Sequence, residues 1–325
     1  MEVPHLFRLW SRTRKPDSKP EDAREAAADE LTIHGLGLEL HETWSFLYSR
    51  PSTFHEFECW VLERNGGKID PARIAEVKRN AEKALSDMPL SWPPLPENFS
   101  PVLSEDDLAF WEENGYIVLK KAVPKEDCEA AEAAIWEFTG MHPENPETWY
   151  EGPQGHSVMV QLVHHPAFEK NRASPRIRAA FAELWETEDL QVTIDRGGFN
   201  PPERPDWPFP GPHLHWDTSI SLPMPKQLQG ILYLTDTPAH QGAFCCVPGF
   251  HRRLESWLAS IAPGEDPRKE ALLLDSFPVA AEAGDFIIWH AGLPHGASPN
   301  RGLRPRIVQY ISMYPPGMAD GRPWI

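Results

Sequence analysis

The segment that decides the fold class is residues 285–314, DFIIWHAGLPHGASPNRGLRPRIVQYISMY. Its two ends are apolar runs of strand length, and the stretch between them is rich in the turn formers glycine, proline and asparagine. We expect residues 286–295 and 306–314 to pair as a hairpin, which would place Arg306 on the strand beside His295.

The chain upstream of this segment repeats the pattern of short apolar stretches. Four further runs have the length of strands: 158–163, 190–195, 229–235 and 243–247. In the same region only 173–186 and 251–260 have helical periodicity. Many short strands of irregular spacing, separated by proline and glycine, favour an α+β fold that is mainly β, a β-sandwich or jelly-roll barrel with helices on one side.

A helix, a strand and a second helix are expected at the start of this β region. Ser104 is placed to cap a helix with Asp107 three positions on, and Gly115 is a typical helix end. Residues 116–119 then fit a strand, and 125–138 an Ala- and Glu-rich helix.

The N-terminal part differs in composition from the β region. Residues 1–30 are charged and Ala-rich without apolar periodicity, which predicts a mobile tail or a short surface helix. Residues 31–87 have apolar residues at helical spacing, which predicts an extension of two or three helices, one of them capped by Asp70 ahead of a proline. Residues 88–101 contain five prolines and predict a linker, so that the β domain covers 102–325.

Three aromatic residues of the extension, Phe54, Phe57 and Trp60, recur at helical spacing. At this spacing, aromatic residues are most often internal core. The alternatives are a cap over a substrate or a partner surface, and a partner surface predicts a homodimer formed through the extension.

Composition excludes several classes of protein. Among 325 residues, 31 Lys and Arg against 48 Asp and Glu give a net charge of −17, which repels phosphate backbones and anionic lipid. We therefore expect no nucleic-acid partner and no membrane partner, and no apolar stretch approaches the roughly 20 residues of a membrane span. Four cysteines, of which we assign Cys245 and Cys246 to the core, and the lack of a secretory signal predict a reducing, cytoplasmic location.

Residues 213–217, HLHWD, are the strongest candidate for chemistry. In a strand, residues two apart project from the same face with Cα atoms about 7 Å apart, so His215 and Asp217 can converge on one metal ion. A histidine and an aspartate hydrogen-bonded at a strand end would produce the same pattern. A third ligand would come from His290 or His295, which have opposite strand parity, so only one of them can face inward without a bulge.

Arg306 extends this candidate site. A buried arginine needs an anion to balance its charge, and its forked guanidinium matches a carboxylate bidentately. This pairing implies a dicarboxylate co-substrate, with one end on the metal and the other on Arg306.

From about Leu103 onward, the sequence resembles the phytanoyl-CoA dioxygenase family of iron(II)- and 2-oxoglutarate-dependent oxygenases. The resemblance rests on four motifs in family order: LSEDDLAFWEENGYIVL at 103–119, His215-Trp216-Asp217, GAFCCVPGFH at 242–251, and the set His295, Gly296, Asn300 and Arg306. Ala297 and Phe250 depart from the family pattern, since serine is usual at both positions, and the first 100 residues match no part of it.

The resemblance implies a double-stranded β-helix, a cupin-like jelly roll, with iron bound by His215, Asp217 and His295. It also implies that Arg306 takes the distal carboxylate of 2-oxoglutarate and that O2 is consumed, with succinate and CO2 released as the substrate is hydroxylated. Halogenation is disfavoured, because Asp217 is present where related halogenases carry glycine or alanine.

Further residues are assigned to the surroundings of the metal. In relatives, the segment matching DRGGFNPP at 195–202 contacts co-substrate or substrate, so we assign Asn200 to 2-oxoglutarate and Arg196 to the substrate. A β-turn with a solvated arginine is the alternative for Arg196. Tyr233 either lines the site next to the co-substrate or packs in the core.

Four more residues are substrate candidates. Gln161 would point its amide into the barrel. Trp207, on a proline-stiffened loop, belongs either to a lid over the site or to the hydrophobic anchor of that loop. His213 is expected near the mouth of the site rather than as a ligand of a second metal, and Trp216 lies between the two ligands.

We therefore expect an Fe(II)- and 2-oxoglutarate-dependent oxygenase that hydroxylates an unactivated C–H bond of a small organic molecule. The acidic charge disfavours an acyl-CoA substrate, since a CoA moiety carries several phosphate charges. The alternatives are a catalytically silent β-helix that serves in ligand binding or assembly, and a metal-dependent hydrolase.

Overall fold

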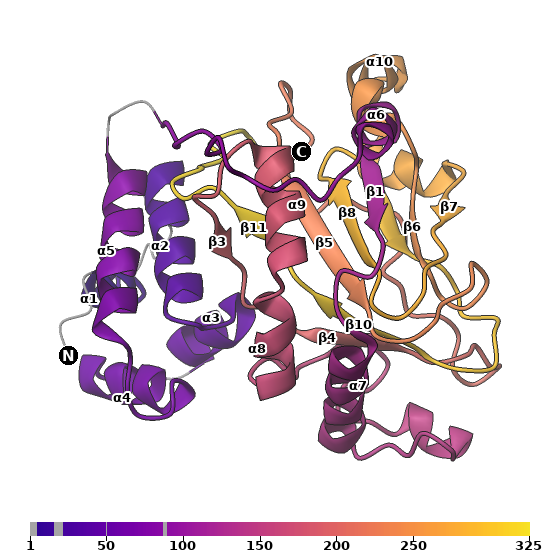
Figure 1. Ribbon diagram of the computed structural model, residues 1–325, viewed down its shortest axis with the longest axis horizontal. Coiled ribbons are helices and arrows are strands. Elements are labelled where there is room, and N and C mark those ends of the chain that lie inside the picture. Colours follow the sequence, from indigo (N-terminus) through magenta and orange to yellow (C-terminus); the bar gives the residue numbers. More distant parts are fainter. Residues whose placement is uncertain (1–4, 16–21, 50, 87–89) are drawn as a thin grey trace. The chain divides into compact units, whose positions relative to one another are not determined.

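The computed structural model describes residues 5–15, 22–49, 51–86 and 90–325. The chain divides into two compact units, each built from segments that are separate in sequence (Figure 1). The first unit comprises Met1–Phe99, Phe181–Asp195 and Met313–Gly321, and the second comprises Ser100–Ala180, Arg196–Ser312 and Arg322–Ile325.

The first unit consists mainly of helices. In chain order these are α1 (Leu6–Arg12), α2 (Ala23–Gly35), α3 (Leu40–Ser49), α4 (Phe54–Arg64) and α5 (Pro71–Leu85). The side chain of Asp70 caps α5 by accepting from Ala72 N at 2.9 Å, as the sequence predicts. Phe57 is fully buried and stacks on Trp60 with ring centroids 6.0 Å apart, so the core interpretation of these aromatic residues is confirmed.

The expected tail over residues 1–30 instead contains α1 and most of α2. Leu6 and Leu9, three residues apart on α1, are fully buried in the core of the unit. Arg8 and Arg12, which the sequence pattern presents as solvated charges, both pair with the buried carboxylate of Asp29, the Arg8 contact being 2.7 Å long. A short apolar stripe and a long-range ion pair therefore order a segment whose local composition predicts a mobile tail.

The expected single domain over 102–325 is corrected in the same way, because residues 181–195 and 313–321 belong to the first unit. These two segments form a two-stranded antiparallel pair, β3 (Gln191–Val192) with β11 (Met313–Tyr314). The backbone N–H of Ile194 donates to Nδ1 of His34 in α2 at 3.1 Å. Strand pairing joins the two segments to each other, and this side-chain bond joins the first of them to α2.

The second unit contains a six-stranded antiparallel sheet, in which β8, β5 and β10 are central (Figure 1). In spatial order its strands are β1 (Tyr116–Leu119), β8 (Phe286–His290), β5 (Leu228–Tyr233), β10 (Arg306–Tyr310), β4 (Gly197–Asn200) and β2 (Met159–Val160). The strands predicted from apolar runs are present, with shorter bounds.

The predicted hairpin between 286–295 and 306–314 is wrong. Strand β5 lies between β8 and β10 and pairs with both, so the two apolar runs are not neighbours. His295 begins β9 (His295–Ala297), which belongs to another sheet. The turn-rich stretch that follows therefore crosses from one sheet to the other, and a local hairpin pattern cannot reveal a strand inserted from elsewhere in the chain.

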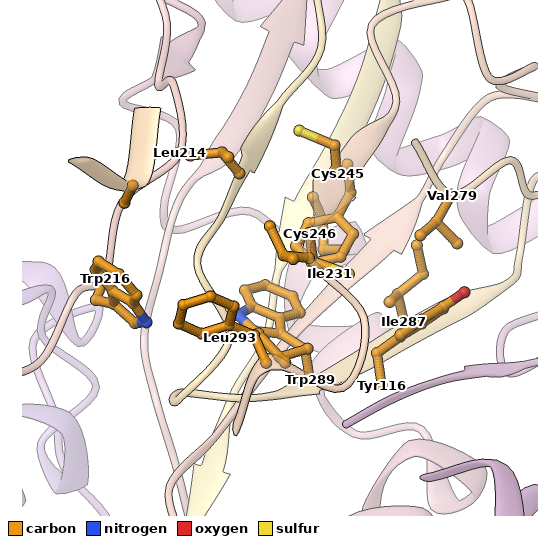
Figure 2. Packing of buried hydrophobic residues seen from close by; sticks show 14 of the residues in the cluster. Tyr116, Leu214, Trp216, Ile231, Cys245, Cys246, Val279, Ile287, Trp289 and Leu293 are labelled. Carbon is orange, nitrogen blue, oxygen red and sulfur yellow. The ribbon is translucent and has the colours of Figure 1, made fainter. Parts of the chain in front are cut away.

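A second, three-stranded antiparallel sheet carries His295. Its order is β7 (Phe277–Pro278), β6 (Phe244–Cys246) and β9. Side chains of both sheets share one buried cluster, in which Figure 2 shows Ile231 and Ile287 of the large sheet with Cys245 and Cys246 of the small one. The assignment of both cysteines to the core is confirmed. The two sheets thus bury their facing sides together. Antiparallel sheets combined with separate helices make the fold α+β.

Strand β4 is absent from the sequence-based prediction because glycine is depleted in strands. The structure requires glycine here. A Cβ on Gly198 would lie 2.8 Å from Cγ2 of Val308, and one on Gly197 would lie 3.0 Å from Cδ1 of Ile135. Close approach of neighbouring side chains, rather than a turn, explains the pair of glycines.

The helices of the second unit follow local signals closely where caps are present. They are α6 (Glu105–Asn114), α7 (Lys125–Thr139), α8 (Pro166–Arg172), the start of α9 (Pro175–Trp185), α10 (Leu254–Ser260) and α11 (Pro267–Glu270). Ser104 and Asp107 form the predicted capping box of α6, and Gly115 ends it with φ of 74°. The short helices α8 and α11 are additions to the prediction. Within the described residues, no helix is long and apolar enough to cross a membrane.

Candidate metal centre

The segment 213–217 reaches the edge of the small sheet and pairs with β9. The backbone N–H of His215 donates to the carbonyl of His295 at 2.9 Å, and the N–H of His295 donates back to the carbonyl of His215 at 3.0 Å. This bridge brings the two imidazole rings together, with centroids 4.7 Å apart. Histidines that are 80 positions apart in the numbering thereby become direct neighbours.

Asp217 completes a group of three possible metal ligands. Its Oδ1 lies 3.2 Å from Nε2 of His215, and its Oδ2 lies 3.2 Å from Nε2 of His295. One ligand atom from each of the three residues lies within 4.8 Å of the others, and no second such group occurs among the residues that the structure describes. Two imidazoles and one carboxylate, converging from one side, are the ligand set of non-heme iron(II) sites.

Backbone carbonyls orient both imidazole rings. Nδ1 of His215 lies 2.7 Å from the carbonyl of His213, and Nδ1 of His295 lies 3.1 Å from the carbonyl of Leu293. A carbonyl only accepts, so each Nδ1 carries the hydrogen and the lone pair of each neutral ring is on Nε2. Both lone pairs then face Asp217, the arrangement that a shared cation requires.

The electrostatics of the group favour positive charge at its centre. Partial burial acts to raise the pKa of Asp217, but hydrogen bonds from His215 and His295, which form when Nε2 of these rings also carries a proton, outweigh burial and hold the pKa well below its ordinary value. Burial acts to lower the pKa of His215, but the hydrogen bond and charge of Asp217 outweigh it and raise the pKa above 6.5. The carboxylate is therefore ionised and attracts a cation to the space between the rings.

His290, the alternative third ligand, lies outside the group. It ends β8, and its ring lies against His251 with centroids 5.4 Å apart. Burial lowers the pKa of His290 to about 4, so the ring is neutral near pH 7. The structure thus brings His295, and not His290, to Asp217.

Arg306 lies at the start of β10, directly opposite Asn200 of β4. Its side chain is only 1% exposed, and its Nε and Nη2 atoms have no hydrogen-bond partner among the described residues. Oδ1 of Asn200, the residue opposite Arg306, and Oγ of Ser298 are also buried without a partner among the described residues. Asn200 links the group, because its Nδ2 donates to the carbonyl of Ser298 at 3.2 Å. A buried cation with unused donors is the arrangement that an anionic ligand would complete.

Residues 111–308 match the family model described as phytanoyl-CoA dioxygenase (PhyH). The chain belongs to the phytanoyl-CoA dioxygenase family. A Dictyostelium discoideum protein named "Putative phytanoyl-CoA dioxygenase" is 22% identical over 259 residues, which cover 63% of this chain and 74% of that protein.

Solved structures similar to this member of the phytanoyl-CoA dioxygenase family include SnoK and HygX. The non-heme α-ketoglutarate-dependent carbocyclase SnoK from nogalamycin biosynthesis is 20% identical, with a TM-score of 0.48 over 69% of this chain and 88% of that one. HygX from Streptomyces hygroscopicus, with nickel and 2-oxoglutarate bound, is 15% identical, with a TM-score of 0.48 over 66% of this chain and 88% of that one.

The hydroxyl of Tyr233 serves to join the two sheets in this member of the phytanoyl-CoA dioxygenase family. It accepts from Phe244 N at 2.8 Å and donates to the carbonyl of Val279 at 3.0 Å. Burial raises the pKa of Tyr233, and the residue is fully buried opposite Val308. These bonds support the interpretation of Tyr233 as a core residue, while its contact with the co-substrate stays a prediction.

Of the predicted substrate residues, Trp216 is buried and Gln161 is exposed. Trp216 is 2% exposed, and its Nε1 donates to the carbonyl of Gly292 at 3.1 Å, so it packs inward between the two ligands. Gln161 is exposed just beyond β2, and its role as a substrate residue stays a prediction. Strand parity places Trp216 opposite to His215 and Asp217, which is the reason that it faces the core.

Of the other predicted substrate residues, Trp207 and His213 lie on the proline-rich segment before His215, and Arg196 lies beside β10. Trp207 is 7% exposed and packs edge-on against Tyr150 at 5.8 Å, so it anchors this loop. His213 is exposed and contacts Phe209 edge-on at 5.4 Å. Arg196 is half-buried, and its carbonyl accepts from Tyr310 N at 3.1 Å. A role for any of them in substrate binding stays a prediction.

Two residues next to Asp217, Gln229 and Arg268, are not predicted from the sequence. Gln229 Nε2 donates to Asp217 Oδ2 at 2.7 Å. Arg268 of α11 donates to the carbonyls of Trp216 and Thr218, each at 2.8 Å, and so holds the backbone on both sides of Asp217. Neither residue belongs to a motif of the phytanoyl-CoA dioxygenase family quoted above. The alternation of β5 would place Gln229 on one face of the sheet, but nothing local indicates that Asp217 meets that face.

Proposed function

We propose that this protein is an Fe(II)- and 2-oxoglutarate-dependent oxygenase that hydroxylates a C–H bond of a small organic molecule. The observation that carries the proposal is the convergence of His215, Asp217 and His295, whose ligand atoms lie within 4.8 Å of one another. Membership of the phytanoyl-CoA dioxygenase family supports it, because the motifs of that family fall on these same residues.

The ligand set fits iron(II). In the neutral ring of each histidine Nε2 carries the lone pair, and the depressed pKa keeps Asp217 ionised, so all three residues can donate to a metal. With three protein ligands, an octahedral ion retains open positions for other molecules. Carbonyls of His213 and Leu293 fix the two rings, which lowers the reorganisation that binding requires.

Arg306 fits the distal carboxylate of 2-oxoglutarate. Its unpartnered Nε and Nη2 present two donors. The hydroxyl of Ser298 offers a third donor, one position after Ala297, which stands where the family usually has serine. When bound, iron would supply the site at which O2 is activated and 2-oxoglutarate would supply two electrons by losing CO2, so that one oxygen atom ends in succinate and the other in the hydroxylated product. The protein's part is to hold the co-substrate between Arg306 and the triad and to exclude water from it.

We further infer that the two antiparallel sheets form the double-stranded β-helix of the family and that the substrate is not an acyl-CoA. Packing of both sheets around one cluster supports the fold, and the net charge of −17 supports the substrate class. The proposal includes a cytoplasmic location and a homodimer formed through the N-terminal helices. It includes no nucleic-acid or membrane partner.

Anaerobic addition of Fe(II) and then 2-oxoglutarate tests the proposal. A weak visible charge-transfer band should appear only after both additions, and air should then release succinate. His295→Ala should abolish both signals, whereas His240→Ala, which alters an exposed histidine outside the site, should leave both unchanged. Absence of the band and of succinate from the unaltered protein would refute the proposal and favour a ligand-binding module. Hydrolysis without O2 would favour a metal hydrolase.

A further inference from the structure

We propose that Gln229, held in place by Trp289, is a positioning residue that fixes the carboxylate of Asp217 for metal binding. This inference rests on the proposed function, since it concerns the same metal centre. It assigns a role to a pair of residues that no family motif contains.

The large sheet itself sets Gln229 beside Trp289. Gln229 of β5 is directly opposite Trp289 of β8, and directly opposite residues project from the same face of a sheet. Nε1 of Trp289 donates to Oε1 of Gln229 at 3.0 Å, and Nε2 of Gln229 donates to Oδ2 of Asp217 at 2.7 Å. The three side chains therefore form one chain of hydrogen bonds that ends on a metal ligand.

Hydrogen-bond chemistry allows only one orientation of the Gln229 amide. An indole N–H only donates, so the amide oxygen must face Trp289. An ionised carboxylate only accepts, so the amide nitrogen must face Asp217. Rotation of the amide by half a turn would set donor against donor and oxygen against oxygen. Trp289 thus guarantees that Asp217 always meets a donor.

Asp217 is the ligand that most needs such support. Its side chain is 53% exposed, against 34% for His215 and 5% for His295. Both histidines are fixed by backbone carbonyls and by the bridge between their strands, whereas Asp217 follows that bridge. An exposed carboxylate samples several rotamers, and ordering it on metal binding costs free energy unless a neighbour has already ordered it.

Trp289 connects this hydrogen-bond chain to the third ligand. It is 3% exposed, and its ring lies 5.1 Å from the ring of His295, centroid to centroid. On its other side it packs against Phe244 of the small sheet at 4.5 Å. One buried indole therefore contacts His295 by packing and reaches Asp217 through Gln229, so the relative positions of two ligands depend on it.

The test uses the full chain and Co(II) alone as the probe. Gln229→Met keeps the length of the side chain and removes both hydrogen bonds, and Trp289→Phe keeps an aromatic ring at the packed position but removes the N–H and part of the indole. Trp136→Phe is the matched control, because it removes an equivalent indole hydrogen bond, to Glu132 at 3.0 Å, outside the metal centre. The Kd for Co(II), the visible spectrum of bound Co(II) and the Tm of the metal-free protein are measured for each variant.

We expect Gln229→Met to weaken Co(II) binding by about 10- to 100-fold and to change the Co(II) spectrum, the range typical for residues that orient metal ligands. Trp289→Phe should weaken binding less, and it should add no further loss in the Gln229→Met background, because phenylalanine still packs on His295 and the lost N–H acts only through Gln229. Trp136→Phe should change neither Kd nor spectrum. The loss of Co(II) affinity should be larger than a fall in the stability of the metal-free protein, measured by its Tm, can explain.

Three outcomes would overturn the inference. An unchanged Kd and spectrum in Gln229→Met would show that Asp217 needs no support. Independent, additive losses in the double variant would remove the role of Trp289 as the holder of Gln229. If Gln229→Met folds poorly, an unchanged Kd and spectrum in Trp289→Phe would remove that role instead. If the unaltered protein binds Co(II) no better than Asp217→Ala does, the proposed function itself fails, and this inference fails with it.

Discussion

Arg306→Met is the substitution that most directly separates co-substrate binding from folding. Arg306 is 1% exposed, and its Nε and Nη2 atoms have no partner among the described residues. Methionine fills a similar volume without the charge. The proposed function therefore predicts opposite effects on two measurable quantities, the affinity for 2-oxoglutarate and the stability of the protein without it.

The size of the first effect follows from the two unused donors. A hydrogen bond to a charged group contributes about 1.5–3 kcal/mol, so losing two of them costs about 3–6 kcal/mol. Even the lower figure corresponds to a loss of affinity on the order of 100-fold, since each 1.4 kcal/mol is a factor of ten. We expect a rise in the Kd for 2-oxoglutarate of at least that order.

The second effect has the other sign. A buried cation without a counter-ion is unfavourable, and replacing it by an apolar side chain of similar size removes that cost. The free energy of unfolding without 2-oxoglutarate should therefore stay equal or rise in Arg306→Met. Added 2-oxoglutarate should raise the Tm of the unaltered protein and leave that of the variant unchanged.

Calorimetric titration with 2-oxoglutarate in the presence of Co(II), together with thermal unfolding, measures both effects. Arg304→Met is the matched control, because Arg304 lies two positions earlier with a side chain 58% exposed and a surface ion pair to Glu144. The control should retain full affinity. Unchanged affinity in Arg306→Met, or a large loss of stability without 2-oxoglutarate, would refute the reasoning and make Arg306 a structural residue.

Four other predictions concern the site and its surroundings. Tyr233→Phe removes the hydroxyl that joins the two sheets, so the free energy of unfolding should fall by about 1–3 kcal/mol in denaturant titration, and an unchanged midpoint would contradict the role given to it. The pKa of His215 is raised above 6.5, and a metal binds only the neutral ring. The affinity for Co(II) should therefore fall as pH drops through that raised pKa, and binding should release a proton. An affinity that does not change with pH would count against His215 as a ligand. In the metal-free protein, the stability that His215 gains from Asp217 should be present below pH 6.5 and lost as pH rises through the raised pKa, which the Tm of the protein with and without His215→Ala reports. Arg268→Met should loosen the backbone around Asp217 and weaken Co(II) binding by roughly tenfold, and full retention of affinity would show that the segment holds itself.

The parts of this structure that the sequence predicts are those decided within a few residues. The capping box of Ser104 and Asp107 and the cap at Asp70 arise from contacts at most three positions apart, so their signals are complete in the sequence. His215 and Asp217 are two apart in an extended segment, and their convergence follows from backbone geometry alone.

The parts that escaped prediction depend on contacts between distant segments. The hairpin prediction failed because β5 is inserted between β8 and β10, and such an insertion leaves no trace in either strand. Gln229 meets Asp217 only because the segment after the His215 bridge passes that face of the large sheet. Strand β4 was not predicted because its glycines are required by the close side chains of Ile135 and Val308, both remote in sequence.

The uneven exposure of the three ligands has a consequence for how the protein acquires its metal. His295 is buried, but the carboxylate of Asp217 is 53% exposed, so the centre has one wall of protein and one side toward solvent. An ion can then enter and leave the finished fold without unfolding it. Affinity for such a nitrogen and oxygen site rises from iron toward nickel and copper, and three fixed ligands do little to reverse that order. The metal found in the purified protein should therefore reflect the supply of ions around it, and dialysis against a chelator followed by iron should restore the working form.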